Sequence, residues 1–306
     1  KRWFSPPVTD QVPQCFQCSN DTISKYFKRI LNTFSSPPIH SLYVQLPSTD
    51  SPTPLEVLQN PKYYPYFSDA IGTIDGTHIT CHPSSKDRDA ARNRKGNLTY
   101  NCLIACSFNM SFLYILSGWE GSAADACVYH DARTTDFNIP PGKYYLADAG
   151  FAACDELLVP YRGVCYHLAE WGHGCQVPCN HRELFNLHHA MLRNVIERIF
   201  GVLKNHFKIL LLPPHYKMDV QVRIPVALCL VHNVIHVHDP NDLMDYHQID
   251  LNEPEDDVGA LAEGPPTAEA CTRAHQHHDE IALRMWEDYN LTRQQRGQPV
   301  IEDNLL

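Results

Sequence analysis

Two acidic side chains interrupt apolar segments that are predicted to be buried strands. Asp75 lies in DAIGTIDGTHIT, and Asp148 lies in GKYYLADAGF. A carboxylate that loses its water destabilises the fold unless a cation or hydrogen-bond donors compensate it. Glycine follows each aspartate closely, at Gly76 and Gly150, which leaves room for a ligand. Either aspartate could instead belong to an ordinary turn, so neither one alone establishes a chemical role.

A third acidic residue, Glu197, lies on a long predicted helix over 183–207. The apolar positions of this helix recur at helical spacing and form a wide arc: Leu184, Leu187, Met191, Val195, Ile196, Ile199, Phe200 and Leu203. The remaining polar strip is narrow and consists of Arg193, Asn194, Glu197, Gly201 and Lys204. Because Glu197 borders the buried face, its carboxylate can point along a sheet edge. An ordinary solvent-exposed position is the alternative for Glu197 by itself.

Two aspartates on strands and a glutamate on a later helix are oxygen ligands of the kind that hard divalent cations prefer. Two such ions, about 3.5–4 Å apart, can activate a water and stabilise the leaving oxygen when a phosphodiester is cleaved. Asp75, Asp148 and Glu197 together therefore predict a catalytic site that holds two Mg²⁺ or Mn²⁺ ions. In this site the three acids are both the metal ligands and the catalytic residues.

The elements that would position these acids are strands in series, followed by helix, strand and helix. Expected strands cover 70–80, a hairpin over 100–121 with FNMS as its turn, and 142–151. Expected helices cover 19–34, 124–134, 183–207 and 221–237. This order predicts a mixed α/β layered fold.

Several longer motifs occur in order over residues 70–238: IDGTHI, RNRKG, GWEGSAADA, GKYYLADAGF, PYRGVCYHLAEW, ELFNLHHAMLRNVIERIFGVLK and LVHNVI. In content and order they resemble the PIF/Harbinger-type transposases of the DDE superfamily of endonucleases. The resemblance implies an RNase H-like mixed sheet flanked by helices, over residues 67–238. It also implies that Asp75, Asp148 and Glu197 are the three family acids, in that order.

The resemblance implies a DNA transposase, which cleaves phosphodiesters at transposon ends and transfers the freed 3′-hydroxyl to target DNA. It further implies double-stranded DNA with terminal inverted repeats as substrate, action in the nucleus, a homo-oligomer and a separate Myb-like DNA-binding partner. The alternative is a domesticated module that keeps the fold and binds DNA or protein without transposing. The apolar runs are too short or too charged to cross a bilayer, so no membrane partner is expected.

The N-terminal segment contains an amphipathic helix at 19–34, with Ser19 or Asn20 as its cap. It resembles the end of the family's helix-turn-helix, so residues 1–34 are interpreted as a partial helix-turn-helix-like segment. An ordinary surface helix is the alternative. The proline-rich stretch 35–66 is expected to be a linker or an irregular wrap.

Basic residues of the helix at 19–34, of the loop at 86–96 and of the helix that carries Glu197 are the expected contacts to the DNA backbone, and an ordinary solvated loop is the alternative for 86–96. They are Lys25, Lys28, Arg88, Arg92, Arg94, Lys95, Arg193 and Lys204. Two further acids, Glu120 and Asp125, are expected to lie just behind the metal ligands. A structural role, such as capping the helix near residue 124, is the alternative for both.

The net charge of −10 is unevenly distributed along the chain. Residues 239–306 contain 16 acidic and 4 basic residues, whereas residues 1–238 contain 19 acidic and 21 basic residues. The acidity therefore belongs to the C-terminal segment and does not argue against a DNA partner. Residues 239–306 are expected to form an acidic, largely disordered tail with a helix at 277–291.

Cysteine and histidine clusters raise a competing possibility, a structural zinc site. CFQC supplies Cys15 and Cys18, and HGCQVPCNH supplies His173, Cys175, Cys179 and His181. A closed zinc site needs four ligands and one short loop rarely provides them all, so Zn²⁺ is the less favoured cofactor. HNVIH lacks the glutamate of a zinc protease motif, so His232 and His236 are expected to be ordinary helix residues.

Overall fold

The computed structural model describes residues 17–164, 177–239, 241 and 268–305 of the 306-residue chain. The strands are β1 Ala70–Thr80, β2 Thr99–Cys106, β3 Phe112–Glu120, β4 Tyr144–Leu146 and β5 Leu157–Leu158. The helices are α2 Asn20–Phe34, α3 His40–Tyr43, α4 Leu55–Leu58, α5 Asp125–Thr135, α7 His181–His206, α8 Met218–Gln221, α9 Arg223–His238 and α11 Ala268–Gln295. A short 3₁₀ helix, Lys208–Leu210, follows α7.

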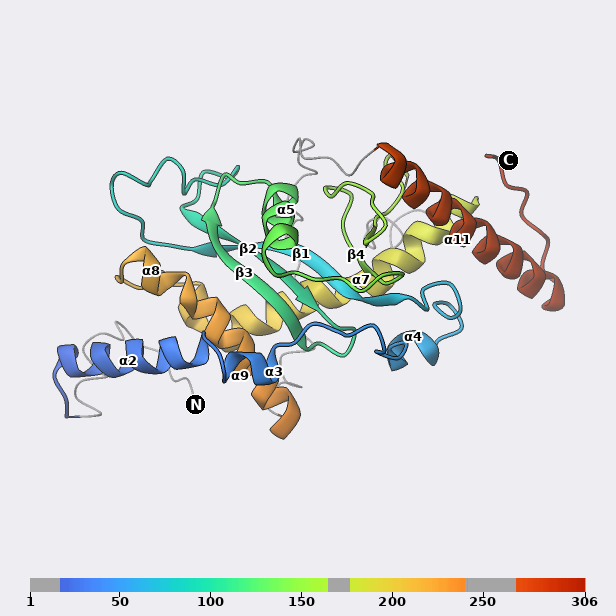
Figure 1. The fold of residues 1–306 in the computed structure, drawn as a ribbon. Helices are drawn as coiled ribbons and strands as arrows, with labels where there is room; N and C mark the ends of the chain where they lie inside the picture. Colours follow the sequence, from blue (N-terminus) through green and yellow to red (C-terminus); the bar gives the residue numbers. More distant parts are fainter. Residues whose placement is uncertain (1–16, 165–176, 240, 242–267, 306) are drawn as a thin grey trace.

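The five strands form one mixed sheet in the order β3-β2-β1-β4-β5. β1 pairs antiparallel with β2 and parallel with β4, so it lies at the centre of the sheet. The β2–β3 hairpin turns at the predicted FNMS segment, where the amide of Ser107 donates to the carbonyl of Ser111 at 2.9 Å. Helices flank the sheet (Figure 1), which confirms the predicted mixed α/β architecture.

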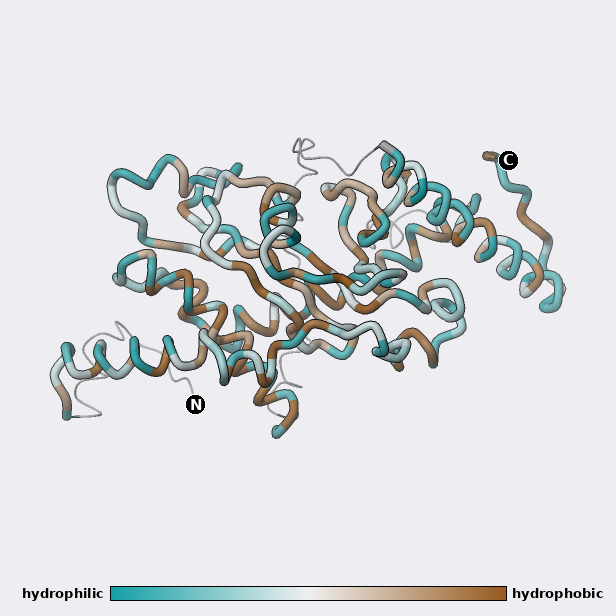
Figure 2. The backbone as a smooth tube through the Cα atoms, in the orientation of Figure 1, coloured by the Kyte–Doolittle hydropathy of each residue, from teal (hydrophilic) through white to brown (hydrophobic). Residues whose placement is uncertain are grey.

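The sheet separates two apolar cores. Alternate residues along a strand point to opposite faces, so neighbours such as Leu103 and Ile104 belong to different cores. Leu103 packs with Phe137 beside α5, whereas Ile104 packs with Ile199 of α7. Figure 2 shows the same arrangement as hydrophobic backbone segments gathered in the strands and hydrophilic segments on the outer helices.

The start of α7 is fixed by side-chain caps, and this sets the position of Glu197 further along the helix. Asn180 is the N-cap, and its side chain accepts a hydrogen bond from the amide of Glu183. The carboxylate of Glu183 in turn accepts from the amide of Cys179 at 2.8 Å. From this start α7 crosses the sheet and contacts β1.

The C-terminal segment differs from the predicted disordered tail. Residues 268–295 form α11, which includes the predicted 277–291 and packs against α7 and β5. Beyond it, Asp303 accepts from the backbone amide of His181 and contacts the ring Nδ1 of His181 at 2.5 Å. The acidic residues of α11 lie on its exposed side while an apolar stripe is buried, so composition alone was misleading here.

Of the two alternatives predicted for the proline-rich stretch 35–66, the structure supports the irregular wrap, because the stretch packs onto the body and buries Val57. Two smaller differences concern the strands. β4 covers only part of the predicted strand 142–151, and the two-residue β5 was not predicted. Helix α2 begins at the predicted Ser19 cap and packs against α9. Residues 1–16 lie outside the described part, so the helix-turn-helix interpretation stays a prediction.

Within the described residues, the segment Met218–His238 is long and apolar enough to cross a membrane by length and composition. It comprises α8 and α9, and α9 packs against β3. Ala227, Cys229 and Leu230 are buried in this contact. The apolar character of the segment is therefore accounted for by its place in the core.

Candidate active site

The carboxylate of Asp75 lies within the central strand and is bound by Arg193. Nη2 of Arg193 is 2.6 Å from Oδ2 of Asp75, and the Gly76 amide donates to Oδ1 at 2.9 Å. β1 continues to Thr80, which excludes the alternative that Asp75 belongs to a turn. Burial raises the pKa of Asp75 well above its usual range, whereas the positive charge of Arg193 acts to lower it.

Arg193 also binds Glu197, one helical turn further along α7. Its Nη1 is 2.8 Å from Oε1 of Glu197, so one guanidinium bridges two of the three predicted acids. The Arg193 side chain is only 5% exposed, whereas that of Glu197 is 39% exposed. The sequence predicts Arg193 as a DNA contact on the surface. The structure buries it instead, because at Arg193 the polar strip of α7 lies against Asp75 of β1.

The pairing of β4 with β1 places Asp148 beside Asp75. β4 runs parallel to β1 with Leu146 opposite Thr73, so Asp148 and Asp75 each lie two residues beyond a paired position. The amide of Gly150 donates to Oδ1 of Asp148 at 3.0 Å. The negative charges of Asp148 and Glu197 both raise the pKa of Asp75, so the three acids are close enough to interact.

Asp125 is a fourth acid at this site. It is the first residue of α5 and so lies in the first turn of this helix, but it is not the N-cap, which is Ala124. Its Oδ1 accepts a hydrogen bond from Nδ2 of Asn101 at 2.6 Å. Burial raises the pKa of Asp125, the Asn101 hydrogen bond lowers it, and the charge of Asp148 raises it further.

A glycine is required at position 76 by the close approach of this acid. A Cβ built on Gly76 would lie 2.0 Å from Oδ1 of Asp125, far inside van der Waals contact. The glycine after Asp75 therefore allows a second carboxylate to lie against the backbone of β1. The glycine of the IDG motif indicated a close approach to the backbone of β1, but the motif did not reveal that Asp125 is the residue that approaches it.

Gly76→Ala is expected to lower the free energy of unfolding by about 1–3 kcal/mol, because overpacking at a filled site displaces its neighbours. The added methyl group must push Asp125 away from Asn101. Denaturant unfolding of the variant measures the loss. In an Asp125→Ala background the same methyl group meets no carboxylate, so its effect should largely disappear. An equal loss in both backgrounds would show that Asp125 is not the group displaced.

Glu120, the other acid expected behind the ligands, is not at the site. Asp75 is opposite Ile104, and Ile104 is opposite Ile115. Glu120 therefore lies five positions further along the edge strand, where it is exposed. The prediction is wrong for Glu120 because strand order, which the sequence did not reveal, places β3 at the sheet edge.

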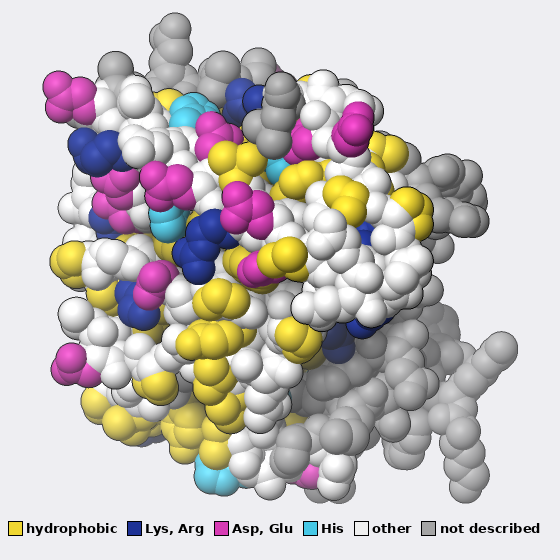
Figure 3. Space-filling model, turned by 90° about the vertical axis from the view of Figure 1, so that its right-hand side faces the viewer, with side chains coloured by type: hydrophobic (Ala, Val, Ile, Leu, Met, Phe, Trp, Pro, Cys, Tyr) yellow, Lys and Arg dark blue, Asp and Glu magenta, His cyan; other side chains and the backbone are white. Residues whose placement is uncertain are grey.

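The remaining predicted DNA contacts lie mainly on the surface. The exposed ones are Lys25, Lys28, Arg88, Arg92, Arg94 and Lys95, and Lys204 is half-buried on α7. The charge of Arg94 lowers the pKa of Asp125, so this loop lies near the acids. Figure 3 shows basic and acidic side chains intermixed on the α4 and α11 side of the molecule, which is not the side of α2 and of the loop between β1 and β2. DNA binding by these residues stays a prediction.

The predicted zinc ligands that the structure describes have other surroundings. His181 contacts Asp303, while Cys18 and Cys179 are exposed. Cys15, His173 and Cys175 lie outside the described residues. His232 contacts the carbonyl of Met110 through Nε2 at 2.9 Å and is, as predicted, an ordinary residue of α9, as is His236.

The chemistry of the four acids fits a hard divalent cation, since all their donors are carboxylate oxygens. A positive charge already lies between two of them, that of Arg193. In the described part of the chain, no three His, Cys, Asp or Glu side chains are grouped closely enough to hold a metal ion. The donor set is therefore suitable, but its present arrangement is closed around a guanidinium.

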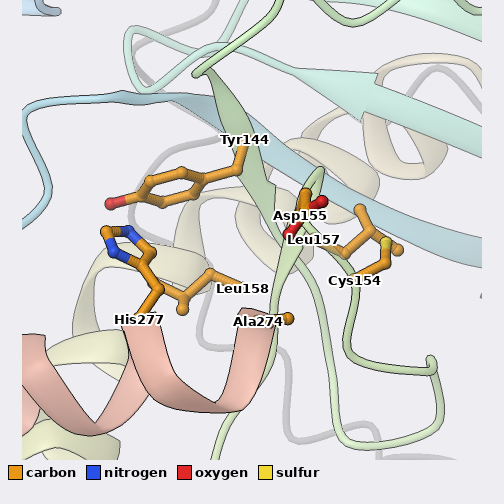
Figure 4. A pocket seen from close by; sticks show the side chains of 7 residues that line it. All are labelled: Tyr144, Cys154, Asp155, Leu157, Leu158, Ala274 and His277. Carbon is orange, nitrogen blue, oxygen red and sulfur yellow. The ribbon is translucent and has the colours of Figure 1, made fainter. Parts of the chain in front are cut away.

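A separate hollow of about 70 Å³ lies between the β4–β5 edge and α11 (Figure 4). None of the four acids lines it. Burial raises the pKa of Cys154 in its wall to about 11, so this thiol is a protonated, weak nucleophile. The hollow has room for only about two waters. It is therefore not the candidate active site.

Comparison with known proteins bears on the segment that carries the acids. A family described as "DDE superfamily endonuclease" matches residues 74–233. Rat and human proteins, each named "Putative nuclease HARBI1", are 25% and 24% identical to this chain over 174 residues. Each alignment covers 55% of this chain and 46% of the relative, so the chain spans about half the length of these curated relatives. No solved structure matches.

The family match covers β1 from Ile74 onward, β4, α5, α7 and most of α9, and therefore all four acids. α2 and α11 lie outside it. The match includes more than half of the chain, and the mixed sheet flanked by helices is the fold that the motifs implied. The chain accordingly belongs to the DDE superfamily of endonucleases, with an α/β, RNase H-like fold.

Proposed function

We propose that this protein is a divalent-metal-dependent DNA endonuclease whose catalytic residues are Asp75, Asp148 and Glu197. The observation that carries the proposal is that Arg193 bridges Asp75 of β1 and Glu197 of α7, while Asp148 follows β4 at the equivalent position beside Asp75. Membership of a DDE endonuclease family supports nuclease activity in general. The specific cofactor, Mg²⁺ or Mn²⁺, follows from the oxygen-only donor set.

When bound, such ions would activate the attacking water and stabilise the leaving oxygen of the phosphodiester. The protein's part is to hold its carboxylates in fixed directions. The Gly76 amide donates to Oδ1 of Asp75, and the Gly150 amide donates to Oδ1 of Asp148, so each amide holds one oxygen of its carboxylate in place. Asn101 orients Asp125 in the same way. This scheme requires no histidine as general base.

The finer proposal is a Harbinger-type transposase. In it the protein cleaves at terminal inverted repeats and the freed 3′-hydroxyl attacks target DNA. The exposed basic residues Arg88, Arg94 and Lys95 lie on the loop nearest the acids and would bind the phosphate backbone. Nuclear action, a homo-oligomer and a Myb-like DNA-binding partner belong to this proposal and rest on the family resemblance.

A second candidate is a domesticated module that binds DNA or protein without transposing. The ion pairs of Arg193 favour this module, because they give Asp75 and Glu197 a positive partner without any metal ion. The relatives named as nucleases are also distant, at 24–25% identity. Intact acids favour the enzyme over this candidate.

The deciding experiment is to incubate the purified protein with DNA that carries the element's terminal repeats, in Mg²⁺, Mn²⁺ or EDTA. Nicking that needs the metal and disappears in Asp148→Asn supports the endonuclease. Asp155→Asn is the matched control, since Asp155 is an exposed acid that pairs with Arg273 and should keep activity. Binding that needs no metal, with no cleavage under any condition, supports the domesticated module and contradicts the enzyme.

A further inference from the structure

The position that a metal ion would need between Asp75 and Glu197 is filled by a side chain of the protein. Arg193 contacts Oδ2 of Asp75 at 2.6 Å and Oε1 of Glu197 at 2.8 Å. The other oxygen of Asp75 accepts from the Gly76 amide. Both oxygens of this acid are therefore engaged, and a divalent ion that binds Oδ2 must compete there with the guanidinium.

We propose that Arg193 is a resident counter-cation that closes the metal site until DNA phosphate draws it away, so that metal loading is coupled to DNA binding. This inference rests on the proposed endonuclease function and adds its regulation. It makes Arg193 a positioning residue: it acts through Asp75 and Glu197 and not on the reacting atoms.

Buried charge explains why such a residue is present. Asp75 lies in the central strand with only 16% of its side chain exposed, where an unpaired carboxylate would destabilise the fold. A guanidinium keeps its positive charge at every physiological pH and so compensates the acids whenever the ion is absent. A full divalent charge beside the same guanidinium would be repelled by it. Arg193 and the metal therefore compete for the same oxygens.

DNA phosphate is the group best suited to release Arg193. A guanidinium binds phosphate through two parallel hydrogen bonds, as it binds carboxylates. The scissile phosphate must approach the acids, and the exposed side of the site is that of Glu197, which is 39% exposed. A phosphate that arrives there meets the Glu197–Arg193 pair first. Transfer of Arg193 to the phosphate would then free Oδ2 of Asp75.

The test is a Mn²⁺ titration of the full-length protein, followed by the electron paramagnetic resonance signal of free Mn²⁺. Wild-type protein should bind Mn²⁺ about tenfold more tightly with a short mixed-sequence DNA duplex than without it. Arg193→Gln should bind Mn²⁺ about tenfold more tightly than wild type without the duplex, and the duplex should add little. Arg198→Gln, an exposed arginine on the same helix, should behave as wild type.

A purely structural role for Arg193 predicts the opposite change, because loss of a structural ion pair would disorganise the acids and weaken Mn²⁺ binding. Equal or weaker Mn²⁺ binding by folded Arg193→Gln would overturn the inference. If that variant does not fold, the wild-type comparison decides: equal Mn²⁺ affinity with and without duplex overturns the inference. If nicking still requires Mn²⁺ in that case, the proposed endonuclease stands and only the coupling fails. No Mn²⁺ binding and no nicking, even with duplex, overturns both.

Discussion

Asp75→Asn is expected to reduce metal-dependent nicking by about a thousandfold or more, equivalent to about 4 kcal/mol of lost transition-state stabilisation. The amide cannot supply the anionic oxygen that a divalent ion requires. The same substitution should lower the free energy of unfolding of the metal-free protein by about 3 kcal/mol, because a buried guanidinium loses one of its two anionic partners. Nicking rates and denaturant unfolding measure the two effects separately.

A double-mutant cycle isolates the pair itself. The double variant Asp75→Asn/Arg193→Gln should lose about 2 kcal/mol less free energy of unfolding than the two single variants lose together. The reason is that the second change removes the charge that the first left unpaired. The pair Lys143–Asp69, at 3.0 Å and with the Asp69 side chain 51% exposed, is the control and should show coupling of about 0–1 kcal/mol. Coupling at Asp75–Arg193 no greater than this control would contradict the buried bridge on which the site description depends.

The sequence was sufficient for the parts of the site that depend on local pattern. A continuous apolar run with one carboxylate marked β1, because the central strand of a mixed sheet is buried on both faces. Helical periodicity located α7 and placed Glu197 at the border of its buried face. The two glycines that accompany Asp75 and Asp148 were also visible, and both amides hydrogen-bond to the neighbouring aspartate.

The parts that depend on contacts between distant segments could not be predicted in the same way. A polar strip on a helix can face solvent or a buried acid, and only the docking of α7 on β1 gave Arg193 its two carboxylates. Glu120 and Asp125 looked equivalent in GWEGSAADA, but strand order places only Asp125 at the site. The sequence predicted the helix at 277–291, but net charge concealed the length of α11 and its packing against α7 and β5, because its acidic residues lie opposite a buried stripe that charge counting does not detect.

Trp286→Ala is expected to lower the free energy of unfolding by about 3–5 kcal/mol, the usual loss when a large buried aromatic is truncated. Trp286 is 5% exposed and belongs to the main core with Ile281 and Met285 of the same helix. Removal of residues 268–306 would expose this whole contact. Since a domain is stable by only about 5–15 kcal/mol, the truncated chain is expected not to fold stably.

The contact also connects α11 to the acids, because α11 packs against α7, the helix that carries Arg193 and Glu197. His278 lies between two rings, 3.8 Å from Tyr161 and 4.2 Å from Phe185 of α7, measured between ring centroids. Leu291→Ala is the matched control, since Leu291 is on the same helix but 54% exposed, and its midpoint of unfolding should be unchanged. If Trp286→Ala and Leu291→Ala unfold at the same denaturant concentration, α11 is an appended tail. If only Trp286→Ala has a lower midpoint of unfolding, α11 is part of the structure that holds α7, and with it Glu197, against the sheet.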